Sequence, residues 1–168
     1  KFSETNVKNG GTLAGTGELG EVNVNDGGTI APGSNPSSIP STIRIANLVL
    51  NGGGNYNWQI WNATSTAGTG WDLISGGNLT ISANATNKFN VNLWSLNATS
   101  PETTGIAQNF NATNDYSWNI GTFTSISGFD ASYFNINTGA INGTGGFVGA
   151  TGNFTLASDG PNLTLKYY

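Results

Sequence analysis

Nine carboxylates are the residues that could do acid–base chemistry in this chain, because the sequence contains no histidine and no cysteine. A glycosidase needs two carboxyl groups that flank one bond. Most of the nine stand beside glycine or in predicted turns, where a short acidic side chain bonds local backbone. Glu18 and Glu21 are close in sequence, but no motif marks them as a catalytic pair. We therefore predict a protein that is not an enzyme and that uses no cofactor.

Metal binding has equally weak support. The absence of Cys and His removes the usual structural zinc sites. The nearest approach to a calcium loop is Asn-Val-Asn-Asp-Gly at 23–27, which lacks the D-x-[DN]-x-[DN]-G pattern. We interpret these residues as a turn closed by a side-chain oxygen, and we predict no metal site.

The five tryptophans suggest a different chemistry, since an exposed indole ring is a platform for the apolar face of a sugar. Trp58 and Trp118 alternate with polar residues and are predicted to point into the core. Trp61 and Trp94 directly follow the apolar residues Ile60 and Leu93, so along a strand their side chains would point to the opposite face. We expect Trp61 and Trp94 to lie at a subunit interface, with sugar binding as the alternative.

The N-x-T motif of N-glycosylation is over-represented. It occurs eight times, against about three expected by chance from 25 Asn and 21 Thr in 168 residues. Attached glycans would help so weakly charged a surface to stay soluble, whereas on a strand the motif simply places two polar residues on the wet face. The candidate asparagines are Asn62, Asn78, Asn84, Asn97, Asn111, Asn142, Asn153 and Asn162.

Composition bounds the class of protein. A chain of 168 residues fits one domain. Only 8% of the residues are charged and the net charge is −4, so the clustered cations that nucleic-acid binding needs are missing. No apolar run is long enough to span a membrane. A surface built from Asn, Ser, Thr and Gly, without Cys, is what we expect of a mature, exported polypeptide.

The elements that must position these residues are predicted to be strands. Apolar residues alternate with polar ones in many short segments, and Gly-rich or Asx-Gly turns separate those segments. Segment 43–50 is apolar on both faces and is the best candidate for a central strand. The alternating apolar sets include Tyr56/Trp58/Ile60, Phe89/Val91/Leu93, Tyr116/Trp118/Ile120, Phe134/Ile136, Phe154/Leu156 and Leu163/Leu165/Tyr167.

Residues 10–33 contain two copies of a Gly-Gly-Thr-aliphatic unit, at 10–13 and 27–30. This segment resembles the autotransporter-associated β-strand repeat of exported bacterial surface proteins. The remainder of the chain, with Gly-Trp-Asp-Leu-Ile at 70–74, is similar to the C-terminal region of such proteins, which often end in a PEP-CTERM sorting tail. The resemblance implies a non-catalytic, extracellular or cell-surface module whose repeats form a right-handed β-solenoid with a corner at each Gly pair.

We therefore predict an all-β fold: a single β-sandwich or jelly-roll-like domain of about ten short strands over 10–168, preceded by an N-terminal arm at 1–9. The alternative is a right-handed β-solenoid section at 10–60 capped by a sandwich. Either fold has strand edges that must be protected or used.

The arm at 1–9 is expected to be free in an isolated monomer and to add to the edge of a neighbouring subunit, with Phe2 and Val7 in pockets. Head-to-tail repetition of that contact would build a filament, that is, a homopolymer. The predicted function is thus a structural subunit of an extracellular bacterial assembly, with itself and attached or bound glycans as partners. The alternative is a carbohydrate-binding or adhesive surface module.

Overall fold

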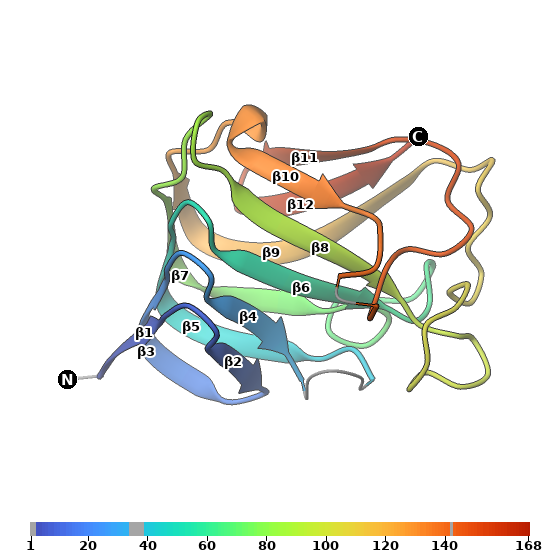
Figure 1. Ribbon diagram of the computed structural model, residues 1–168, viewed down its shortest axis with the longest axis horizontal. Helices are drawn as coiled ribbons and strands as arrows, with labels where there is room; N and C mark the ends of the chain where they lie inside the picture. The colour runs from blue at the N-terminus through green and yellow to red at the C-terminus, as the bar shows by residue number, and fades with distance from the viewer. Residues whose placement is uncertain (1–2, 34–38, 142) are drawn as a thin grey trace.

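Two β-sheets face each other across one hydrophobic core (Figure 1). The computed structural model describes residues 3–33, 39–141 and 143–168. The predicted all-β class is confirmed: this described part contains twelve strands and one short 3-10 helix, η1 (Ala131–Tyr133).

The two sheets differ in size. In spatial order, the seven-stranded sheet consists of β1 (Glu4–Val7), β3 (Glu18–Val24), β5 (Thr42–Leu50), β7 (Leu73–Ile81), β9 (Tyr116–Ser127), β12 (Asn162–Tyr167) and β11 (Phe154–Asp159). The five-stranded sheet consists of β10 (Phe134–Asn137), β8 (Phe89–Ser95), β6 (Asn55–Ile60), β4 (Thr29–Pro32) and β2 (Thr12–Gly15).

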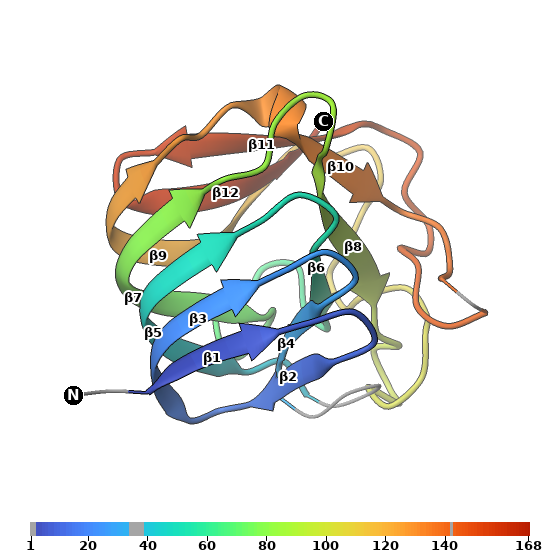
Figure 2. The same cartoon turned by 60° about the vertical axis from the view of Figure 1, so that its left-hand side comes forward.

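Successive strands alternate between the two sheets up to β10, so each strand pairs with the strand two places away in the chain (Figure 2). All of these pairs are parallel. The chain therefore winds in coils, each with one strand in either sheet. Side-chain alternation says which face of a strand is buried, but not in which direction the strand pairs.

The inward faces predicted for the middle of the sheets are confirmed. Tyr56, Trp58 and Ile60 of β6 are fully buried, as is Trp118 of β9. The Trp58 and Trp118 rings meet across the core with their centroids 5.8 Å apart. Tyr116, predicted to share the inward face of β9, is only half-buried and stacks on Trp118.

Segment 43–50 forms an interior strand, β5, as predicted. Ile45 and Leu48, three residues apart, both point into the core, so the alternation changes phase between them. The paired strand β7 carries Gly76 and Gly77 at this level. A Cβ atom on Gly76 would overlap the Ile45 carbonyl oxygen, so the two backbones approach here more closely than any side chain allows.

Glycines form the corner that leads into each of the first three strands of the five-stranded sheet. Gly10, Gly27 and Gly53 have φ values of 76°, 69° and 79°, in a region of backbone conformation that residues other than glycine rarely adopt. Gly10 N donates to Gly27 O at 3.1 Å, and Gly27 N donates to Gly53 O at 3.0 Å. The two Gly-Gly-Thr units thus stack as equivalent corners. The third corner has the sequence Gly-Gly-Asn-Tyr at 53–56, which departs from the Gly-Gly-Thr-aliphatic unit because Asn replaces Thr and Tyr replaces the aliphatic residue.

The N-terminal segment is not free in this structure. Residues Glu4–Val7 form β1, which pairs in parallel with β3 of its own chain, and Val7 is buried in the core. The alternation Glu-Thr-Asn-Val resembles that of the strands that follow, so the segment adds to its own sheet. Phe2 lies outside the described residues.

The opposite end of the seven-stranded sheet is an antiparallel hairpin, in which β12 pairs with β9 and β11 pairs with β12. The hairpin packs its aromatic residues against those of nearby loops. Ring centroids 4.9–5.3 Å apart link Phe154 to Tyr167, Tyr167 to Phe110, and Phe110 to Phe147. These contacts cover the core at this end.

Candidate functional site

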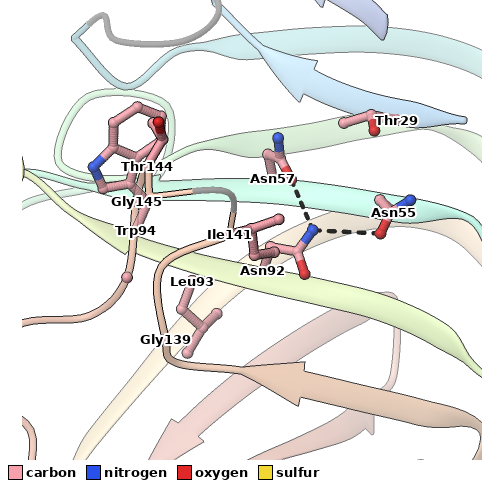
Figure 3. A pocket seen from close by; sticks show the side chains of 11 residues that line it. Thr29, Asn55, Asn57, Asn92, Leu93, Trp94, Gly139, Ile141, Thr144 and Gly145 are labelled. Atoms are coloured by element: carbon pink, nitrogen blue, oxygen red, sulfur yellow. Dashed lines mark hydrogen bonds between the residues drawn. The ribbon is translucent and has the colours of Figure 1, made fainter. Parts of the chain in front are cut away.

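A groove lies on the outer face of the five-stranded sheet, and we call it the asparagine groove (Figure 3). Its volume is about 390 Å³. Its floor is formed by β6 and β8, and its far wall by residues that follow β10, namely Gly139, Ile141 and 144–146. The residues that define it are Asn55, Asn57, Asn92, Trp94, Ile141 and Gly145.

The asparagines of the groove belong to rows that run across the parallel strands. Register aligns Asn57 of β6 with Asn92 of β8 and with Asn137 of β10. Asn137 Nδ2 donates to Asn92 Oδ1 at 2.8 Å, and Asn92 Nδ2 donates to Asn57 Oδ1, also at 2.8 Å. Parallel pairing in register makes such rows, because it stacks identical side chains from successive coils.

The second candidate surface is the N-terminal edge, formed by the outer strands β1 and β2. Val7 O accepts a hydrogen bond from Asn25 N at 2.9 Å, and Gly11 O accepts one from Thr29 N at 2.9 Å. Peptide groups alternate in direction along a strand. The peptide groups of Asn6 in β1 and Ala14 in β2 therefore face away from the paired strand, on the side where no other strand of the described residues pairs.

Neither of the two singled-out tryptophans is an exposed platform. Trp94 is 8% exposed, and its Nε1 donates to Thr104 Oγ1 at 2.7 Å. Its ring lies beside Gly145 and closes one end of the asparagine groove. Trp61 is half-buried, and its Nε1 donates to Ala98 O at 3.2 Å. Segments distant in sequence supply this cover, so parity within a strand could not predict it; a role at a subunit interface stays a prediction.

The N-x-T motifs have a structural explanation for half of their number. Four are Asn-Ala-Thr turns in which one Asn Oδ1 accepts from both the backbone N–H and the hydroxyl of the Thr, at 2.8–3.3 Å. Such turns join strands whether or not sugar is attached. Their asparagines are Asn62, Asn84, Asn97 and Asn111.

The other four motifs fall elsewhere. Asn78 and Asn162 lie on strands, where their side chains bond Asn47 and Thr122, and Asn153 is exposed beside β11. Asn142 lies outside the described residues. Exposure favours Asn84 and Asn111 among the turn residues as acceptors of sugar, and glycosylation stays a prediction.

Asp72 is the residue that sequence reasoning did not distinguish from the other acids. It is fully buried, with Oδ1 accepting from Ser41 N at 2.8 Å and Oδ2 accepting from Gln59 N at 3.0 Å. Burial raises the pKa of this carboxyl well above its usual value, and the two backbone N–H groups offset that shift only in part. Asp72 thus joins the starts of β5 and β7 to the end of β6, which is a structural role.

Asp72 should make stability depend on pH. Because the pKa is raised in the folded state, the folded protein holds a proton that the unfolded chain has already lost, and the free energy of unfolding falls as pH rises from about 4 through the folded pKa. In Asp72→Asn this fall should disappear, since the amide does not titrate. Urea unfolding at several pH values measures it, with the exposed-residue variant Glu102→Gln as control. Equal pH dependence in Asp72→Asn and the wild type would contradict the assignment.

Among the described residues, no three or more of His, Cys, Asp and Glu gather as a metal site would require, and no helix is long and apolar enough to cross a membrane. No protein-family model matches the chain, and no curated protein sequence matches it.

Proposed function

We propose that this chain is a non-catalytic structural subunit of an extracellular bacterial assembly, joined to its neighbours by β-strand addition at the N-terminal edge. The observation that carries this proposal is that edge itself: β1 and β2 each pair in parallel and in register with the strand behind them, and no further strand of the described residues lies on their outer side. Natural proteins usually block such edges with proline, charge or a covering loop.

The edge is ready to continue both the core and the hydrogen-bond ladder. Val7 continues a buried row with Val24, Leu50 and Ile81, and Leu13 continues another with Ile30. Leu13 is half-exposed, because among the described residues it has a neighbouring coil on one side only. A further coil would bury this row and pair the outward peptide groups.

Strand directions permit a head-to-tail polymer. At the far end the terminal strands are β10 in one sheet and β11 in the other. β10 runs parallel to β2 through an unbroken series of parallel pairs. β11 is reached from β9 by two antiparallel steps, which restore the direction of β1. Stacking β1 on β11 and β2 on β10 of the next copy would therefore be parallel in both sheets, and a repeated contact of this kind builds a filament.

We also propose that the winding is that of a short right-handed β-solenoid, as the repeat resemblance implies. The support is the alternation of strands between sheets, the parallel pairing and the ladder of glycine corners. Such a section would reach Asn137, well beyond the range 10–60, with the antiparallel hairpin as its cap. The weakly charged surface and the repeat resemblance support an extracellular or cell-surface location, with glycans at exposed N-x-T turns.

Proline substitutions test the assembly. Asn6→Pro and Ala14→Pro remove N–H groups that face outward, so the protein should fold while filaments are lost in electron micrographs of the secreted protein. Asn6→Ala and Ala14→Ser keep those N–H groups and should assemble normally. Intact filaments in a correctly folded double proline variant would refute the proposal. Deleting residues 1–9 is a poorer test, because it also removes Val7 from the core.

Carbohydrate binding is a second candidate function, favoured by the asparagine groove beside Trp94. The groove lies on the outer face of β6 and β8, whereas assembly would use the edges of β1 and β2. The two functions can therefore coexist in one molecule.

A further inference from the structure

We infer that the asparagine groove is a binding site for a neutral mono- or disaccharide, with the Asn57 side-chain amide as its principal hydrogen-bond donor. This inference rests on the second candidate function and is independent of strand addition. Figure 3 shows the groove, with Trp94 at one end, the amides of Asn55, Asn57 and Asn92 along the floor, and Ile141 beside Asn92.

The hydrogen bonds of the amide row leave one donor group unused. Asn137 donates to Asn92, and Asn92 donates to both Asn57 at 2.8 Å and Asn55 at 3.4 Å. The row then ends, because the neighbouring strand β4, with the sequence Thr-Ile-Ala-Pro, has no side-chain amide to continue it. Within the part of the chain that the structure describes, the Asn57 Nδ2 group has no acceptor. Two N–H bonds at the end of a chain of amides are thus available to a ligand oxygen, and a chain of this kind strengthens its terminal donor.

The chemistry of the lining selects a neutral ligand with hydroxyl groups. Of the described residues that line the groove, none is charged. A carboxylate, phosphate or ammonium group would therefore enter without the counter-charge that compensates its lost hydration. Amides and the hydroxyls of Thr29 and Thr144 can instead donate to and accept from sugar hydroxyls.

The size of the asparagine groove and the apolar groups at its rim also suit a small sugar. The volume of about 390 Å³ falls in the range of small-molecule sites. Ile141 is 42% exposed at the rim, and Trp94 presents an apolar surface at the end of the groove. A pyranose ring has an apolar C–H face and a rim of hydroxyls, so it can contact Ile141 and Trp94 while it bonds the amide row.

The experiment is a titration of the ¹⁵N-labelled protein followed through its side-chain amide signals. The probes are methyl glucoside, N-acetylglucosamine and cellobiose, with glucuronate as a charged counterpart. At least one neutral sugar should shift the Asn57 and Asn92 signals in a saturable way, and glucuronate should bind more weakly. Asn57→Ala should weaken binding by about tenfold, the effect of losing one or two hydrogen bonds.

Asn135→Ala is the matched control, because Asn135 also joins an amide row, donating to Asn90 at 3.1 Å, but does not line the groove. Asn135→Ala should bind sugar as the wild type does. Ala14→Pro, which is designed to block assembly, should also bind sugar normally, because the groove does not use the edge strand. No saturable shift with any neutral sugar up to its solubility limit, or equal affinity in Asn57→Ala, would overturn the inference. Tighter binding of glucuronate than of every neutral sugar would do so as well.

Discussion

Gly76→Ala is expected to destabilise the protein by at least about 3 kcal/mol, or to prevent folding, because the added methyl group has no space. In β7 this glycine lies against the backbone of β5, and its Cβ would overlap the carbonyl oxygen of Ile45. Backbone cannot move aside as a flexible side chain can, so β5 and β7 would have to separate. Urea unfolding followed by circular dichroism measures the loss.

The matched control is Gly17→Ala. A Cβ on Gly17 has no atom within 4 Å and meets no backbone strain, so its effect should stay within about 0.5 kcal/mol. Gly77→Ala, whose Cβ would overlap the Ala46 carbonyl oxygen, should behave like Gly76→Ala. A Gly76→Ala protein as stable as Gly17→Ala would show that β5 and β7 do not approach each other as described.

Trp58→Ala is expected to cost about 4 kcal/mol of unfolding free energy, since it leaves a large cavity at the centre of the core. The ring is completely buried and packs against Trp118. The Trp58 Nε1 also donates to the backbone carbonyl of Asp72 at 2.9 Å, and in Trp58→Ala this carbonyl would lose its hydrogen-bond donor. Circular dichroism during urea unfolding reports the change without depending on tryptophan emission.

Trp61→Ala is the control for Trp58→Ala, because it removes a side chain of the same type three residues further along the chain. Because Trp61 is half-buried, the loss there should be nearer 1–2 kcal/mol, roughly the value of its partial burial and one hydrogen bond. Equal losses in the two variants would mean that Trp58 does not occupy the core position described.

The candidate sites were harder to predict than the core, for a reason that Trp94 illustrates. Trp94 lies two residues after Asn92 in β8, so both side chains are on the outer face of that strand, and both line the groove there. The cover over its ring comes from Gly145 and from Thr104, which lie in other segments of the chain. Asp72 is a similar case, because its carboxylate accepts hydrogen bonds from the backbone N–H groups of Ser41 and Gln59, which belong to other segments. No pattern local to either residue encodes these contacts.

The all-β class, the inward faces of the central strands and the glycine corners at Gly10 and Gly27 can all be predicted from the amino-acid sequence. Each of these follows from a short-range property: the alternation of side chains along an extended chain, or the freedom of glycine at positive φ. Three features become visible only in the folded protein: the strands pair in parallel, residues 4–7 form the edge of their own sheet, and asparagines align along a groove. These features depend on pairing between strands many residues apart, and such pairing is selected by the packing of the whole core rather than by any one segment.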